Sequence, residues 1–347
     1  MVLKIKYLLQ DNFKQALILK SLIFLTGRQR KTLERVSFDG EFKISAGTRS
    51  YASPPTRRLK NLSDRKEIVN AKRGFTFKRS NPGKNLVRMI IATYNVNGVN
   101  GRLPVLLKWL KESQPDVVCL QELKSPDEKY PEAALLQAGY NSIWHGQKSW
   151  NGVAILTKSN LKVAEVKRGL PGSKEDVQSR YIQALVNKIL VICIYLPNGN
   201  PAPGPKFDYK LAWFKRLNSK ARSLIKLNTP VIMAGDFNVI PEDIDAYKPE
   251  RWVNDAVFFP ESRDYYRKLI KQGWTDSIRT LYPTSKIFTY WDYFRNAFGR
   301  DAGIRMDHIL LNKALRNRLK KGGVHKHVRG WENTSDHAPV WVEISDK

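Results

Sequence analysis

The strongest constraint on the fold of this chain is a series of short apolar runs that begins at Met89 and alternates with amphipathic stretches. Several runs are apolar at nearly every position, as in strands that are covered on both faces. The amphipathic stretches at 103–112, 209–227 and 263–273 have helical spacing. This alternation predicts an α/β domain over 89–347. The predicted strands are 89–94, 116–121, 153–157, 189–196, 231–237, 305–311 and 338–344.

The first 88 residues differ from this domain in charge and in pattern. Residues 1–87 contain 20 Lys and Arg against 6 Asp and Glu, which is half of the net charge of +28. They include turn-rich segments such as SPPTRRLKN and show little apolar periodicity, a composition typical of disorder. We therefore interpret 1–88 as a basic, disordered N-terminal extension or a targeting segment. A basic tail without a targeting role, or an upstream stretch without function, remains an alternative.

The charge and the cysteines restrict the partners and the compartment. A net charge of +28 favours a polyanionic partner, either nucleic acid or an acidic membrane surface. No apolar run approaches the roughly 20 residues of a bilayer span. Cys119 and Cys193 each lie in an apolar run, which favours buried thiols in a reducing, intracellular compartment. We expect a bacterial cytoplasm, or a mitochondrion or nucleus if the extension is a eukaryotic targeting segment.

Polar residues recur at or just after the ends of the predicted strands. A single Asp-Phe-Asn or Ser-Asp-His is more often a turn or a helix cap, because short polar side chains bond to nearby backbone. Strand ends in a layered α/β domain converge on one edge, so six such segments predict one shared pocket. The residues are Asn95, Asn97, Gln121, Glu122, Tyr195, Asn198, Asp236, Asn238, Asp307, His308, Asp336 and His337.

Asp307 is the hardest of these residues to explain as structural. It lies in an apolar run, and a buried carboxylate requires a partner. His337 is the candidate partner. The remaining histidines outside the strand ends are interpreted as surface or structural residues, namely His145, His325 and His327.

The motifs at these positions resemble the ordered set of the exonuclease III and AP-endonuclease family. They are NVNG at 95–98, LQELK at 120–124, YLPNG at 195–199, GDFNV at 235–239, GIRMDHILL at 303–311 and SDHAPV at 335–340. Other phosphodiesterases of the superfamily share only the Asn, Glu, GD-N and SDH elements. The stretch TYWDYFRNAFGRDAGIRMDH at 289–308 is similar to the DNA-repair branch. This resemblance implies a four-layered sandwich of two mixed β-sheets flanked by helices.

The resemblance also implies an activity. The expected enzyme is a monomeric phosphodiester hydrolase that cuts double-stranded DNA 5′ to abasic sites and removes nucleotides or blocking groups from 3′ ends in base-excision repair. Its expected cofactor is Mg²⁺, with Mn²⁺ as a substitute, because this chemistry requires a cation to neutralise charge at phosphorus and Mg²⁺ prefers oxygen ligands. The expected ligands are Glu122 with Asn95 and Asp336, and Asp236 and Asn238 for a second ion, with His337 as a further candidate.

The expected catalytic residues divide the remaining work. Asp236 would deprotonate the attacking water, and Asn238 would donate a hydrogen bond to the phosphate or to that water. His337 would contact a phosphate oxygen, with Asp307 fixing its tautomer and favouring its charged form. Tyr195 would reach the scissile phosphate or the leaving oxygen.

A second group of residues is expected to select the substrate. Trp291 and Ile304 match the positions where this family builds an apolar pocket for a flipped-out sugar that lacks its base. Either residue could instead belong to the core. The expected contacts to the DNA backbone are Arg102, Lys124, Trp150, Asn151, Asn198 and Arg295.

Two alternatives remain at this point. One is another phosphodiesterase of the superfamily that acts on RNA or phospholipid, which the stretch at 289–308 disfavours. The other is a catalytically dead DNA-binding protein. That alternative requires losses among the polar strand-end residues, and every expected one is present.

Overall fold

A computed structural model describes residues 88–345, with the exception of the Glu165 side chain. The prediction for residues 1–88 therefore lies outside the described residues, except for Arg88, which begins the first strand. No helix within 88–345 has both the length and the apolar character required to cross a bilayer.

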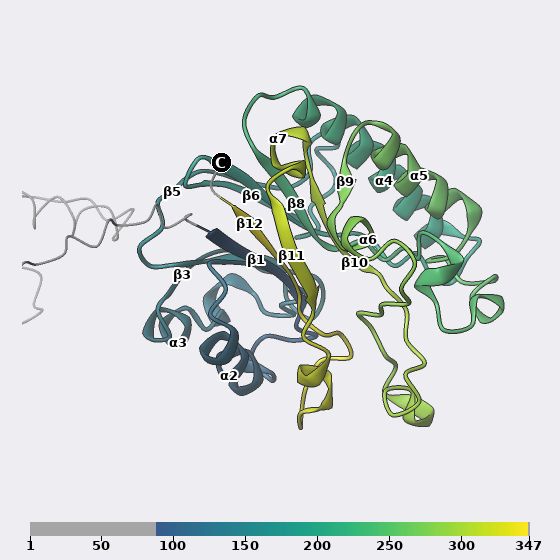
Figure 1. The fold of residues 1–347 in the computed structure, drawn as a ribbon, viewed down its shortest axis with the longest axis horizontal. Helices are drawn as coiled ribbons and strands as arrows, with labels where there is room; N and C mark the ends of the chain where they lie inside the picture. The colour runs from purple at the N-terminus through teal and green to yellow at the C-terminus, as the bar shows by residue number, and fades with distance from the viewer. Residues whose placement is uncertain (1–87, 346–347) are drawn as a thin grey trace, which may run out of the picture. The chain divides into compact units, whose positions relative to one another are not determined.

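Two six-stranded sheets form the centre of the domain (Figure 1). The first has the order β11-β12-β1-β2-β4-β3 and the second β5-β6-β7-β8-β10-β9. The β1–β2 and β7–β8 pairs are parallel and the other pairs antiparallel, so both sheets are mixed. The strands are β1 (Arg88–Asn95), β2 (Val117–Gln121), β3 (Tyr140–His145), β4 (Val153–Lys158), β5 (Val163–Arg168), β6 (Tyr181–Val186), β7 (Ile189–Tyr195), β8 (Val231–Asp236), β9 (Thr275–Asp276), β10 (Asp307–Leu311), β11 (Leu319–Val324) and β12 (Val340–Ser345).

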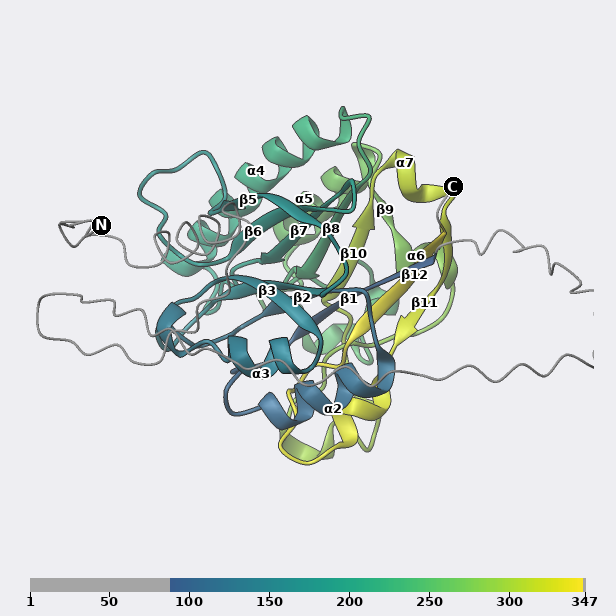
Figure 2. The same cartoon turned by 90° about the vertical axis from the view of Figure 1, so that its left-hand side faces the viewer.

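Helices cover the outer face of each sheet (Figure 2). One apolar cluster lies between the sheets, a second joins the second sheet to α4 and α5, and a third joins the first sheet to α2 and α3. The predicted four-layered sandwich is therefore confirmed. The helices are α2 (Leu103–Ser113), α3 (Glu132–Gln137), α4 (Pro205–Ile225), α5 (Pro260–Lys271), α6 (Ser277–Leu281) and α7 (Lys313–Arg316).

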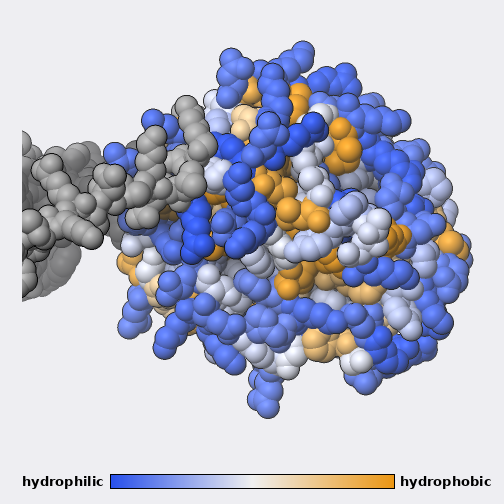
Figure 3. All heavy atoms as spheres, in the orientation of Figure 1, coloured by the Kyte–Doolittle hydropathy of each residue, from blue (hydrophilic) through white to orange (hydrophobic). Residues whose placement is uncertain are grey.

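The helix positions follow from the sequence pattern with small shifts. Both α4 and α5 begin earlier than predicted, each at a proline. Proline suits the first helical turn because the N–H groups of that turn have no partner within the helix, so the missing N–H of proline costs nothing there. Gly273 follows α5 with φ +105°, the left-handed backbone that ends helices. The apolar faces of the helices lie in these clusters. On the face drawn in Figure 3, hydrophilic residues therefore cover most of the surface, and hydrophobic residues are scattered among them.

Strand register brings the polar strand ends to one edge. In the second sheet Asp236 pairs with Tyr195 on one side and with Asp307 on the other. In the first sheet Asn95 ends β1 and pairs with Gln121, the last residue of β2, which Glu122 follows directly. The sheets pack face to face, so these two sets of ends meet.

Candidate active site

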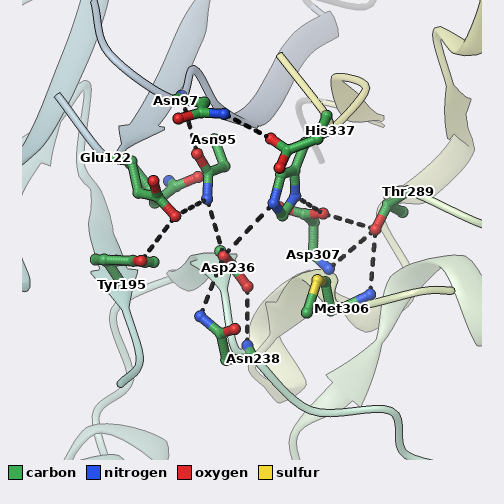
Figure 4. A network of polar contacts seen from close by, with 12 residues as sticks. Asn95, Asn97, Glu122, Tyr195, Asp236, Asn238, Thr289, Met306, Asp307 and His337 are labelled. Carbon is green, nitrogen blue, oxygen red and sulfur yellow. Dashed lines mark hydrogen bonds and ion pairs between the residues drawn. The ribbon is translucent and has the colours of Figure 1, made fainter. Parts of the chain in front are cut away.

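Asn95 links the two sheets at the centre of the site (Figure 4). Its Nδ2 donates to Glu122 Oε1 at 2.9 Å and to Asp236 Oδ2 at 2.9 Å. Asn95 and Asp236 are buried. The two carboxylates predicted to act on one phosphate therefore share a single amide.

Glu122 has two further polar contacts, a hydrogen bond and an ion pair, beside this amide. Tyr195 donates its hydroxyl to Oε1 at 2.7 Å, and Lys124 Nζ lies 2.8 Å from Oε2. Burial alone raises the pKa of Glu122, but Lys124, Asn95 and Tyr195 lower it overall. Burial and the nearby carboxylates raise the pKa of Tyr195 well above its usual value. Glu122 is thus an anion at neutral pH, and Tyr195 is a neutral phenol that donates its proton.

Asp307 and His337 form a buried pair on the opposite side of Asp236. The His337 Nδ1 and Asp307 Oδ2 atoms are 2.8 Å apart, and Thr289 Oγ1 donates to the same oxygen at 2.6 Å. Burial lowers the pKa of His337, but Asp307 and the other nearby carboxylates raise it to about 10 overall. His337 is therefore a cation at neutral pH, with Nε2 lying 3.9 Å from Asp236 Oδ2.

Asp236 is held by the residue two positions further along the chain. The Asn238 N–H donates to Asp236 Oδ1 at 2.8 Å, and Asn238 Nδ2 donates to Asp236 Oδ2 at 3.2 Å and to the Leu196 carbonyl at 2.9 Å. Burial raises the pKa of Asp236 to about 7, although His337 acts in the opposite direction. A carboxylate with a pKa near neutrality is suited to accept a proton from water.

Asp336 lies beside this centre and is connected to it through Asn97. Asn97 Nδ2 donates to Asp336 Oδ1 at 3.1 Å, and its Oδ1 accepts from Lys124 Nζ at 2.6 Å. Asn97 N donates to Asn95 Oδ1 at 3.0 Å. The oxygens of Asn95, Glu122 and Asp336 therefore belong to one connected network.

The donor chemistry of the site fits a divalent cation. Glu122 and Asp336 supply the hard carboxylate oxygens that Mg²⁺ prefers. Among residues 88–345 one group of His, Cys, Asp and Glu has ligand atoms within 4.8 Å of one another, and it consists of Asp236, Asp307 and His337. Asp307 Oδ1 is buried without a hydrogen-bond partner among the described residues. A doubly protonated His337 has no lone pair for a metal, so this geometry favours its hydrogen-bonding role over the ligand role.

Gln121 and His308 were expected at the shared pocket, and the structure places both of them elsewhere. Gln121 Nε2 donates to Cys193 Sγ at 3.3 Å, in the layer between the sheets. His308 Nε2 lies 3.2 Å from the Val239 carbonyl, and its ring is fully buried. Gln121 precedes Glu122 and His308 follows Asp307. Because neighbouring residues of a strand point to opposite faces, Gln121 and His308 point away from the site.

Trp291 and Ile304 are both buried in this structure. Trp291 Nε1 donates to Asp301 Oδ1 at 3.0 Å. Ile304 pairs with Tyr290 and Ala246 through isolated β-bridges. Each side chain is only 1% exposed, so both are packed in apolar clusters, which is the core alternative that the sequence left open.

The predicted DNA-binding residues differ in exposure. Trp150 is 69% exposed, whereas Asn151 is buried and bonded to Gln147 and Gln178. Arg295 is exposed in the short 3₁₀ helix Phe294–Asn296, and Arg102 is half-buried. Asn198 is exposed and donates from Nδ2 to Asn238 Oδ1 at 3.0 Å, and Lys124 lies within the network around Glu122.

The sequence reasoning missed Lys210 and Thr289. Lys210 is fully buried on α4 and donates from Nζ to the carbonyls of Asn198 and Asn238 at 2.9 and 2.6 Å. Burial lowers its pKa to about 7. A signal was available for this residue, because Lys210 lies three residues before Trp213 and therefore on the apolar face of the helix. No comparable signal marks Thr289.

The family of the chain follows from comparison with known proteins. The model of the Endonuclease/Exonuclease/phosphatase family matches residues 92–337, and the chain belongs to this family. Exodeoxyribonuclease III of Haemophilus influenzae is 35% identical over 268 residues, which are 74% of this chain and 100% of that protein.

Solved structures of similar proteins include two that cover nearly the same part of the chain. The 3′ phosphatase NExo from Neisseria, bound to product DNA hairpin, has a TM-score of 0.71 and 39% identity, covering 74% of this chain and 99% of that one. An AP endonuclease from Archaeoglobus fulgidus has a TM-score of 0.71 and 34% identity, covering 75% of this chain and 100% of that one.

Proposed function

We propose that this protein is a DNA-repair nuclease that hydrolyses the phosphodiester 5′ to abasic sites and removes nucleotides or blocking groups from 3′ ends in base-excision repair. The observation that carries the proposal is the shared contact of Asn95 with Glu122 and Asp236, opposite the Asp307–His337 pair. These contacts bring anionic and cationic groups close together, which supports their action on one phosphate. The names of the relatives and the DNA-bound Neisseria structure support DNA as the substrate.

Glu122, Asp336 and the Asn95 oxygen are the residues that would hold a divalent cation, Mg²⁺ or Mn²⁺. When bound, the cation neutralises charge on the phosphate and on the leaving oxygen. The anionic form of Glu122, which its lowered pKa favours, is the form that binds a cation.

The proton-transfer and hydrogen-bonding roles are assigned to Asp236, His337 and Tyr195. Asp236 accepts the proton of the attacking water, and Asn238 orients that carboxylate through two hydrogen bonds. His337 donates from Nε2 to a non-bridging phosphate oxygen, where a positive charge is most effective as negative charge develops. Tyr195, whose hydroxyl donates to Glu122 in this structure, would turn its proton toward the leaving oxygen when substrate is bound.

The proposed substrate is double-stranded DNA with abasic sites or 3′ ends, bound by a monomer in an intracellular compartment. Trp150, Arg295 and Asn198 are exposed, which supports them as contacts to the DNA backbone. Contacts of this kind do not read sequence. Since Trp291 and Ile304 are packed in the core here, a pocket for the sugar at these residues requires local opening.

The test is a duplex with one abasic-site analogue, incubated with the full-length protein. We expect a nick 5′ to the analogue with Mg²⁺, none with EDTA, and recovery when Mg²⁺ is restored. Asp236→Asn should abolish turnover while DNA binding is retained. Asp264→Asn, which changes a carboxylate on the exposed face of α5, is the matched control and should leave nicking unchanged.

Two results would contradict the proposal. The first is hydrolysis of a phosphoinositide, of sphingomyelin or of an RNA tail with abasic DNA left intact, which would assign the site to another substrate class. The second is DNA binding without any cleavage under all metal conditions, which would indicate a binding protein with an inactive scaffold.

A further inference from the structure

Lys210 brings a hydrogen-bonding amino group beneath the site from the helix layer. Its side chain is fully buried, and its ammonium group donates to two main-chain carbonyls, those of Asn198 and Asn238. Among residues 88–345 no carboxylate lies within ion-pair distance of it. Burying an ammonium group without a counter-ion is costly, so these two contacts compensate for a substantial loss of hydration.

The two carbonyls belong to different loops that follow parallel strands. Asn198 lies after β7 and Asn238 lies after β8. The Lys210 amino group on α4 therefore joins the two loops beyond Tyr195 and Asp236, where the strand pairing ends. Hydrogen bonds of Leu196 and Asn198 also connect these loops.

Close packing reinforces this connection. A Cβ atom added at Gly199 would lie 2.6 Å from Lys210 Cδ, so the first loop rests directly on the lysine stem. Gly199 also has φ +94°, and Asn238 has φ +44°, so both loops contain a residue in the left-handed region. An orientation of this kind persists only where the surroundings hold it.

The side chains of the two asparagines are connected on the other side of these carbonyls. Asn198 Nδ2 donates to Asn238 Oδ1 at 3.0 Å, and Asn238 Nδ2 donates to Asp236 Oδ2 at 3.2 Å. A chain of contacts therefore runs from Lys210 through both asparagines to the carboxylate assigned as the base. A shift of either carbonyl would move a side chain that faces the substrate.

We propose that Lys210 is a positioning residue for phosphodiester cleavage, which holds the Asn198 and Asn238 loops so that both amides and Asp236 face one phosphate. The proposal rests on the function proposed above. Lys210 itself does not touch the substrate, because it lies beneath the two loops with no exposed surface.

The first measurement is single-turnover cleavage of the abasic duplex by Lys210→Met and Lys210→Arg. We expect Lys210→Met to cleave about tenfold to a hundredfold more slowly, since a displacement on the order of 1 Å can cost about a hundredfold. DNA affinity measured in EDTA should remain near that of the unaltered protein. Lys210→Arg keeps the charge and should recover part of the rate. Lys220→Met, which removes a more exposed lysine of the same helix, is the matched control.

A double-mutant cycle separates positioning from a general loss of stability. If Lys210 acts through Asn198, the change in activation free energy of the double variant will differ from the sum of the changes in Lys210→Met and Asn198→Ala. A lower melting temperature with an unchanged rate for the folded protein would overturn the proposal. Additive effects of the two substitutions would also overturn it.

One readout does not depend on cleavage. In Lys210→Met the side-chain amide signals of Asn198 and Asn238 should shift in NMR spectra, and the amides of both loops should exchange faster with solvent. Unchanged signals would contradict the positioning role. If the unaltered protein fails to nick abasic DNA, the function proposed above fails, while this measurement still tests whether Lys210 holds the loops.

Discussion

Asp307 shows how one residue controls the charge of another. It lies in a buried strand, and its Oδ2 accepts a hydrogen bond from the Thr289 hydroxyl. The same oxygen lies 2.8 Å from His337 Nδ1. Its negative charge raises the pKa of His337 against the effect of burial. The sequence indicated this partner, because a carboxylate in an apolar run cannot be stable without one.

Asp307→Asn tests this control. The amide keeps an oxygen acceptor for His337 but removes the negative charge, so the pKa of His337 should fall from its present value of about 10. His337 then loses its proton at a lower pH, and the alkaline limb of the cleavage rate should shift to lower pH. At neutral pH we expect a loss of roughly a hundredfold.

The measurements for this variant are the pH–rate profile and an NMR titration of the His337 ring. Asp243→Asn alters an exposed carboxylate and serves as the control. An unchanged titration of His337 would show that Asp307 does not set its charge.

At the scale of elements, a second buried network supports the strands beneath the site. Arg305, which precedes β10, donates to Asp245 Oδ1 at 2.6 Å and to Asp276 Oδ2 at 2.8 Å. Tyr266 on α5 donates to Asp276 at 2.8 Å, and His308 lies beside Arg305. The network therefore joins a loop, a helix and two strands of the second sheet.

Arg305→Met should destabilise the fold strongly. The substitution leaves Asp276 with an unpaired buried charge and leaves Asp245 with Arg279 as its remaining ion-pair partner. Breaking a buried pair in this way costs about 3–5 kcal/mol. The free energy of unfolding in urea measures the effect. Arg267→Met removes a more exposed arginine on α5 that pairs with Glu242, and should cost less than about 1 kcal/mol. Equal losses in the two variants would contradict this account.

The same network predicts a pH dependence of stability. Burial, together with Arg305, lowers the pKa of His308 from 6.5 to about 4. The unfolded chain therefore takes up a proton before the folded chain does as pH falls through this range. The contribution of His308 to the free energy of unfolding is at its full value above pH 6.5 and decreases as the pH falls toward about 4. The slope is up to about 1.4 kcal/mol per pH unit for one proton.

His308→Gln should make this decline shallower by the contribution of that proton. The measurement is urea unfolding at several pH values below 6.5. His327→Gln, which changes an exposed histidine on the surface, is the control. A slope that is the same in His308→Gln and in the unaltered protein would exclude His308 as the source.

At the scale of the whole molecule, charge is divided between two parts of the sequence. Half of the net charge of +28 lies in residues 1–87, outside the described residues, and the rest belongs to the part that carries the sandwich. We expect the basic extension to add salt-sensitive affinity for DNA, because its Lys and Arg side chains can neutralise phosphates.

A comparison of the full chain with residues 88–347 tests that prediction. The full chain should lose DNA affinity more steeply as salt increases, because its additional Lys and Arg displace counter-ions from phosphates. Fluorescence anisotropy between about 50 and 200 mM salt measures both slopes. Identical slopes would indicate that residues 1–87 do not contact DNA.

Seven of the eight inner strands were predicted from the sequence, and none of the four edge strands was. All seven predicted strands occur, whereas β3, β5, β6, β9 and β11 were not predicted. Four of these five lie at sheet edges. Edge strands are covered less completely, so their sequences, such as LKKGGV in β11, lack the uniform apolar character of central strands.

The sequence by itself determined the α/β class, the confirmed family and most of the residues that meet at the site. These properties depend on local patterns, namely apolar runs and the polar residues that end them. Only the tertiary structure decided which side of its strand each residue faces, and it therefore excluded Gln121 and His308 from the predicted pocket. It also placed Lys210 beneath two loops and buried Trp291 and Ile304. Contacts of this kind join segments that are far apart in the chain, and no local pattern specifies the distance between them.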